Sequence, residues 1–145
     1  MQITKPAITV TATTVLAAAV ALSPTASANT ATYSNAAGNV RCEMYQSASG
    51  TDTICVSDTA RKTQPECNPP SHLIPSVSIS RDFTGTGCWN QGFVGQPKKL
   101  NPLQFQQFGP VIVVPGFSGN LYVFDTARMA LIRAGSANSV IWKLR

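Results

Sequence analysis

Short runs of β-branched and aromatic residues, separated by turn residues, recur along the chain and predict β-strands. Four of these runs lie in the last third of the sequence: Val111–Val114, Leu121–Phe124, Met129–Ile132 and Val140–Leu144. Asp125–Arg128 lies between the second and third runs and predicts a hairpin loop. This part of the chain therefore predicts an antiparallel sheet.

The middle of the chain carries weaker strand patterns between irregular segments. Val40–Tyr45 and Thr53–Ser57 flank a turn-rich stretch and predict a hairpin. Val77–Arg81 alternates apolar and polar residues, as a half-buried strand does, and a short strand is expected at Cys88–Asn90. The connecting segments are predicted to be an irregular proline-rich connector at Arg61–Pro75, a loop at Gly92–Pro102 and one helical turn at Leu103–Phe108.

These patterns favour an all-β fold, either a small antiparallel sandwich or an open barrel. About seven short strands are expected, and no long stretch after residue 28 has the apolar stripe of a helix. We expect residues 39–145 to form a single β-rich domain. The small polar residues at 29–38 predict a flexible lead-in.

Residues 1–28 have the pattern of a cleaved secretory signal peptide. Lys5 precedes an uncharged run at Ala7–Leu22, and Ala26-Ser27-Ala28 provides small residues for cleavage. The alternative, a membrane anchor, is disfavoured because a run of about 16 residues is shorter than the roughly 20 needed to span a bilayer. We therefore expect a secreted, extracellular protein with no membrane span in the mature chain.

Charged residues are scarce, which narrows the classes of function. They make up 12% of the 145 residues, against about 25% in typical domains, and the formal net charge is +5. The basic residues are scattered, whereas a nucleic-acid binder concentrates them on one face, so no nucleic-acid partner is expected. With six acidic residues and one histidine, the sequence predicts no cofactor, no metal and no catalytic residue.

Four cysteines, in a chain expected to be exported, predict two disulfide bonds. Their spacing alone allows three pairings, but the first predicted hairpin favours Cys42 with Cys55, which leaves Cys67 with Cys88. A zinc site is the alternative. It is disfavoured because there is no C-x-x-C motif and the single histidine is a poor fourth ligand.

The first hairpin resembles a known family. Ala37-Gly38-Asn39-Val40-Arg41-Cys42, followed by Ile54-Cys55-Val56, is similar to the opening of small secreted actinobacterial domains of unknown function. The resemblance implies a disulfide-stapled β domain and an extracellular location, but no activity. Such domains typically have a third cysteine pair in the late hairpin, whereas no cysteine follows Cys88 here. We expect apolar packing to replace it, with Val123 facing Ala130 and with Val111–Val114 and Trp142 adding burial.

Hydrolase chemistry has little support in the residues. Nucleophilic catalysis needs a base beside the nucleophile, and His72 is the one histidine of the chain. It lies in the segment Pro70–Pro75, where a loop histidine packed on proline is the simpler interpretation. The acidic residues show no spacing that favours a glycosidase pair. The proline-rich segment Pro65–Pro75 could instead act as a rigid protease-inhibitor loop.

Aromatic side chains are the remaining candidates for a binding surface. Most of them, including Trp89 beside a disulfide cysteine, are expected in the core. Phe93 and Phe117 lie in glycine-flanked loops and are candidates for a ligand-facing patch. The function that these patterns favour is a non-catalytic extracellular binding or interaction module with an extracellular or cell-wall partner. The alternative is a small secreted hydrolase or protease inhibitor, and the oligomeric state stays open.

Overall fold

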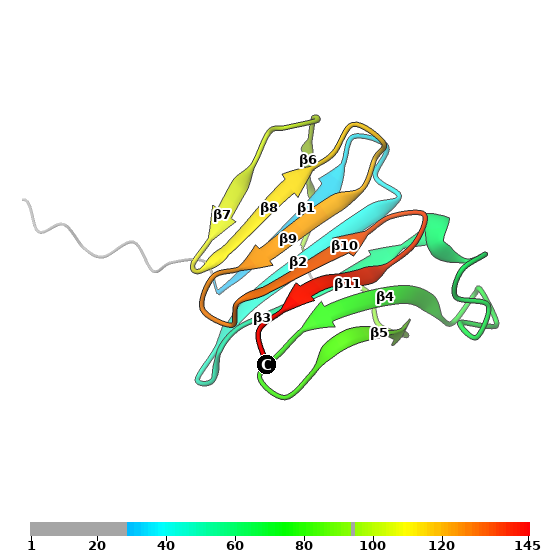
Figure 1. Cartoon of the computed structure of the whole chain (residues 1–145). Helices are drawn as coiled ribbons and strands as arrows, with labels where there is room; N and C mark the ends of the chain where they lie inside the picture. The colour runs from blue at the N-terminus through cyan, green and yellow to red at the C-terminus, as the bar shows by residue number, and fades with distance from the viewer. Residues whose placement is uncertain (1–28, 94) are drawn as a thin grey trace, which may run out of the picture.

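Two β-sheets packed face to face make up the domain in the computed structural model, which describes residues 29–93 and 95–145 (Figure 1). One sheet has six strands in the order β5-β4-β3-β2-β1-β6, and the other has five in the order β11-β10-β9-β8-β7. The predicted all-β class is confirmed, and the architecture is a sandwich of two open sheets. The predicted signal peptide, 1–28, lies outside the described residues.

The six-stranded sheet comes from the first two thirds of the described chain. Its pairings are antiparallel except for β1 with β6, which run parallel. A short 3-10 helix, Asp58–Ala60, follows β3. The strands are β1 (Thr30–Asn35), β2 (Val40–Ser47), β3 (Gly50–Ser57), β4 (Ile74–Ile79), β5 (Thr84–Trp89) and β6 (Lys98–Leu100).

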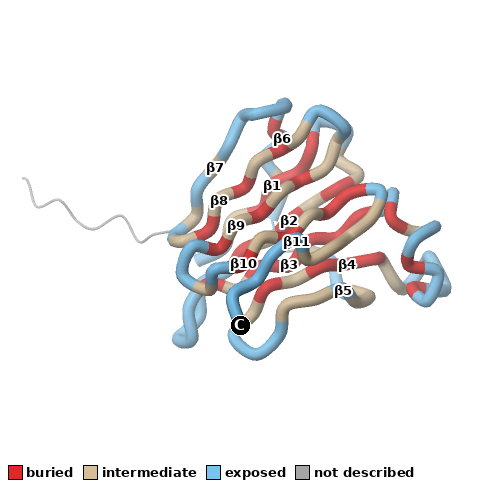
Figure 2. The backbone as a smooth tube through the Cα atoms, in the orientation of Figure 1, coloured by how far each residue is buried: buried red, intermediate tan, exposed pale blue. Residues whose placement is uncertain are grey.

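The five-stranded sheet is antiparallel throughout and comes from the last third of the chain. Along β8, β9 and β10, fully buried residues alternate with half-buried ones, as Figure 2 shows by red and tan segments. The strands are β7 (Gln106–Phe108), β8 (Val111–Pro115), β9 (Leu121–Asp125), β10 (Ala130–Ala134) and β11 (Ser139–Lys143).

The core lies between the sheets and is filled by alternate residues of the central strands. Because neighbouring side chains of a strand point to opposite faces, each strand contributes every second residue to the core. Side-chain hydrogen bonds also join the sheets, from Ser57 Oγ to Gly135 O at 2.7 Å and from Asn35 Nδ2 to Gly119 O at 2.9 Å. The fully buried apolar residues include Met44, Val77, Ile79, Leu100, Val111, Val113, Leu121, Val123 and Ile132.

Both favoured disulfides are present. Cys42 of β2 lies directly opposite Cys55 of β3, and the bond between them is buried in the core. Cys67 bonds to Cys88 and fastens the irregular proline-rich connector to β5. Two disulfides in one small domain indicate that it forms in an oxidising environment.

The expectation of a flexible lead-in at 29–38 does not hold. Thr30–Asn35 forms β1, which pairs with β2 on one side and β6 on the other. Ser34 and Asn35 are buried there, and the Asn35 amide donates to Asn39 Oδ1 at 2.7 Å. Small polar residues gain stability in this position because backbone pairing and side-chain hydrogen bonds satisfy their polar groups.

Two expectations for the segment before β8 are also wrong. The predicted loop at Gly92–Pro102 contains β6, and the predicted helical turn at Leu103–Phe108 is replaced by a turn and β7. Leu103 has a φ of 64°, which a right-handed helix excludes. The prolines on either side limit the length of the segment but do not make it helical.

The late hairpin differs from expectation by its register and by one aromatic side chain. Asp125 pairs with Ala130, so Val123 faces Ile132 rather than Ala130. The turn therefore begins one residue later than predicted, and Met129 closes it with a φ of 50°. Trp142 does not add core burial, because it points outward and is 42% exposed.

Candidate binding surface

The outer face of the five-stranded sheet is apolar, although nothing in the described chain covers it in the view of Figure 1. Antiparallel sheets with one solvated face usually alternate apolar residues inside with polar residues outside. Here the outward residues of β8 to β11 are mostly apolar as well, and most of them are half-buried. We name this surface the apolar face, and it consists of Ile112, Val114, Tyr122, Phe124, Leu131 and Trp142.

Strand register brings these side chains into two parallel rows. The first row crosses four strands through Ile112, Phe124, Leu131 and Trp142. The second row runs from Val114 through Tyr122 to Arg133. Side chains that lie opposite each other on neighbouring strands touch, so each row forms a continuous strip.

The first row ends in an aromatic contact and in a polar boundary. The rings of Phe124 and Trp142 lie 6.5 Å apart between centroids and are tilted by 43°. At the other end, Gln107 of β7 lies opposite Ile112 and donates to Gly109 O at 3.0 Å. Arg133 brings a cation into the second row and donates from Nε to Ala137 O at 3.3 Å. The face is thus apolar with a cation at one margin.

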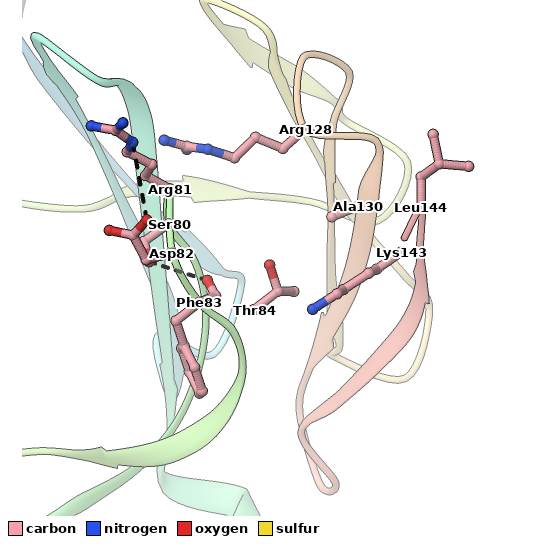
Figure 3. Close-up of a pocket in the computed structure, with 9 residues that line it drawn as sticks. All are labelled: Ser80, Arg81, Asp82, Phe83, Thr84, Arg128, Ala130, Lys143 and Leu144. Carbon is pink, nitrogen blue, oxygen red and sulfur yellow. Dashed lines mark hydrogen bonds and ion pairs between the residues drawn. The ribbon is translucent and has the colours of Figure 1, made fainter.

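A cleft opens between the two sheets at the end of β11 (Figure 3). Its volume is about 260 Å³, and its lining comes from the β4–β5 turn, from the β9–β10 turn with Ala130, and from Lys143 and Leu144. Figure 3 shows the side chains of Arg128 and Lys143 extending from the five-stranded sheet toward the β4–β5 turn. Lys143 follows the outward Trp142, so alternation places it on the inner side of β11.

The cations around this cleft differ in how well their charge is balanced. Arg128 donates to Thr51 O and to Asp52 Oδ1 at 2.9 Å, and forms an ion pair with Asp125 at 3.5 Å. Arg81 pairs with Asp82 at 4.0 Å, and both side chains are well exposed. Lys143 forms no ion pair or hydrogen bond with the described residues. Arg128 is therefore structural, whereas Lys143 is available to a ligand.

A second, smaller groove lies on the outer face of the six-stranded sheet. It has a volume of about 200 Å³ and is lined by Tyr45, Asp52, Ile54, Ser78 and Trp89, among others. Burial raises the pKa of Tyr45, and the carboxylate of Asp52 raises it further. Trp89 is half-buried beside this groove rather than in the core between the sheets.

The structure places the two predicted binding residues in separate surroundings. Phe117 is 80% exposed in the β8–β9 turn and lines a cavity of about 160 Å³ with Leu100 and Gly116. Phe93 does not line that cavity and is half-buried in the connector between β5 and β6. A binding role for either residue stays a prediction.

The apolar face is missing from the sequence predictions, although the sequence carries a signal for it. Val111–Val114 and Leu121–Phe124 are apolar at every position, whereas a strand with one solvated face alternates. Such continuous runs indicate strands with apolar side chains on both faces. Their outward residues are therefore the ones that sequence reasoning could have selected.

The residues of the predicted hydrolase alternative are not assembled into a catalytic arrangement in the described chain. His72 is exposed in the proline-rich connector. The connector is held by Arg61, whose Nη1 donates to Leu73 O at 2.9 Å. Across 29–93 and 95–145, no group of three or more His, Cys, Asp or Glu could hold a metal ion. The helices within the same ranges are too short or too polar to cross a bilayer.

Comparison with known proteins identifies no relative. The chain matches no model of a known protein family, no curated protein and no solved structure. What is established is a disulfide-bonded, all-β domain of two sheets.

Proposed function

We propose that the mature chain is a secreted, non-catalytic binding module and that its ligand lies on the apolar face. The disulfides support an extracellular location, as does the resemblance of the first hairpin to small secreted actinobacterial domains. The observation that carries the proposal is the apolar outer face itself. Exposed contiguous apolar patches on soluble domains commonly mark interaction sites.

The size of the face sets the strength of binding. Four strand spacings of about 4.8 Å and four residue rises of about 3.4 Å give a footprint of roughly 250 Å². Burying that area on the protein and a matching area on the ligand would contribute about 12 kcal/mol, whereas association costs about 4–15 kcal/mol. Over the upper part of that range of costs, burial of the face alone leaves no net binding free energy. Useful affinity therefore requires many copies of the ligand or contacts beyond the face.

Retention on extracellular material tests this proposal. The immobilised mature chain is incubated with cell-wall and secreted-protein fractions of the source organism, and bound material is compared among variants. Phe124→Ser and Tyr122→Ser remove aromatic rings from the apolar face, and each is expected to reduce retention at least fivefold. Phe117→Ser removes an exposed ring elsewhere and serves as the matched control.

The control also separates the two candidate surfaces. Equal retention by wild type and both face variants would contradict binding at the apolar face. Loss of retention in Phe117→Ser alone would assign binding to the cavity beside the β8–β9 turn. Circular dichroism of each variant establishes that the sheet structure is retained.

A further inference from the structure

The two sheets have four edge strands, and β11 differs from the other three. β6 and β7 have three residues each, and β5 carries glycine at two of its six positions. β11 has five residues, neither glycine nor proline, and no described strand hydrogen-bonded to its outer side. Because very short strands and strands with interior glycine pair weakly, β11 is the described edge best suited to accept an added strand.

The side chains at the end of β11 are exposed and apolar. Ile141 is 47% exposed, Trp142 is 42% exposed, and Leu144, just after the strand, is 62% exposed. Trp142 also forms the last member of the first row of the apolar face. A strand added beside β11 would therefore continue the apolar face with its own outward residues and would gain backbone hydrogen bonds along the edge.

The inward residues of such a strand would meet the cleft of Figure 3. Lys143 lines that cleft from β11 and forms no ion pair or hydrogen bond with the described residues. Arg81 and its ion-pair partner Asp82, which lies 4.0 Å away, line it from the β4–β5 turn. Since Asp52 and Asp125 balance Arg128, and Asp82 offsets Arg81, the charge available to a ligand comes mainly from Lys143. An acidic side chain on the ligand would complement this positive charge.

We propose that the edge of β11 is a docking site for an extended, acidic segment of another protein. In that segment apolar residues alternate with aspartate or glutamate, so that one set extends the apolar face and the other reaches the cleft. This inference rests on the proposed binding function and names its partner class. The docked segment would also supply the contacts that the apolar face alone lacks.

A second copy of this chain fits the edge less well. A second copy carries the same net positive charge and presents no acidic residue on its own β11, so it does not complement Lys143. The β10–β11 register also shifts between Leu131 and Ile132, which leaves Ile141 as an extra residue. Such a bulge increases local twist, and a flexible peptide can follow it more readily than a second rigid edge.

Short blocked peptides test the proposal directly. One alternates valine with glutamate, a second alternates valine with lysine, and a third is the glutamate peptide with alternate backbone nitrogens methylated. Backbone amide NMR of the full mature chain reports where each peptide binds. The glutamate peptide is expected to shift β11 amides and protect them from exchange, with at least fivefold weaker binding by the other two.

A charge-reversal pair of variants isolates the cleft. Lys143→Glu is expected to weaken the glutamate peptide about fivefold and to favour the lysine peptide. Lys98→Glu makes the same change of net charge on β6, at the opposite edge of the sandwich, and is expected to leave both affinities unchanged. Both lysines are exposed, so each variant is expected to fold.

Three results would overturn this inference. They are equal binding of the glutamate and lysine peptides, amide shifts that avoid β11, and a dimer through β11 detected by light scattering without peptide. Retention that depends on Phe124 while all peptides fail to bind would reject the partner class but leave the proposed function standing. Equal retention by wild type and Phe124→Ser would reject the proposed function.

Discussion

Replacing Arg128 with methionine is expected to cost about 3 kcal/mol of the free energy of unfolding. Arg128 extends from the β9–β10 turn to the β2–β3 hairpin and so joins the two sheets. Its side chain is 18% exposed, and those of its partners Asp125 and Asp52 are 1% and 15% exposed. Removing one member of a buried ion pair typically costs 3–5 kcal/mol because the other charge loses its partner, and the partial exposure here favours the lower end, about 3 kcal/mol.

Asp125 decides the size of this effect. Its Oδ1 accepts hydrogen bonds from the backbone N–H groups of Ala127 and Arg128, both at 2.9 Å, which shapes the turn. Its Oδ2 has no hydrogen bond and relies on the ion pair with the guanidinium. Asp125→Asn keeps an oxygen for the turn and removes the charge. The double variant Asp125→Asn/Arg128→Met is therefore expected to be about 1–2 kcal/mol more stable than Arg128→Met alone.

Urea unfolding followed by circular dichroism measures these differences. Arg81→Met provides the control, because its pair with Asp82 is well exposed and is expected to contribute less than about 1 kcal/mol. The reasoning fails if Arg128→Met loses no more stability than Arg81→Met. It also fails if removing the charge of Asp125 does not relieve the loss. Since domains of this size are stable by roughly 5–15 kcal/mol, a 3 kcal/mol loss is readily measured.

Three further outcomes follow from the core. The double variant Cys42→Ala/Cys55→Ala should lose about 3 kcal/mol in denaturant unfolding, because the bond closes a loop with a sequence separation of 13. Burial raises the pKa of Tyr33 above its usual 10.0, so stability should fall as pH rises past 10, and less so in Tyr33→Phe. Val123→Thr, which buries a hydroxyl, should cost more stability than Phe124→Thr on the half-exposed outer face.

Local patterns were sufficient to predict the hairpins and both disulfides. The β2–β3 hairpin and the β9–β10 hairpin join strands that are close in sequence, so turn residues and apolar runs specify them locally. The pairing of Cys42 with Cys55 follows from that hairpin. Once that disulfide is formed, Cys67 and Cys88 can pair only with each other.

Strands held by distant pairing could not be predicted in this way. β1 consists mostly of small or polar residues, and much of its stability comes from lying between β2 and β6. β6 has three residues and pairs in parallel with a strand more than sixty positions earlier in the chain. Neither the composition of these strands nor an alternation of apolar and polar residues predicts such pairing, because the backbone provides the hydrogen bonds.

The candidate site could not be predicted from the sequence for a different reason. Apolar residues in a β protein are assigned to the core by default, and an apolar run does not say which of its faces is solvated. Only the pairing registers show that Phe124, Leu131 and Trp142 share the outer face. The loop residues Phe93 and Phe117 were selected instead because aromatic residues flanked by glycine can be recognised in a sequence before the fold is known.

The contacts that hold the sheets together do not use the apolar face. Inward residues such as Val113 and Ile132 lie between the sheets, and the Arg128 ion pairs lie at one end of the sandwich. The two disulfides lie within the six-stranded sheet and its connector. Outward positions of an antiparallel sheet can be polar without loss of core burial, and polar residues there favour solubility. Six apolar side chains in two continuous rows therefore have no role in the packing of the sandwich. A ligand on that face, with an added strand at β11, gives them one.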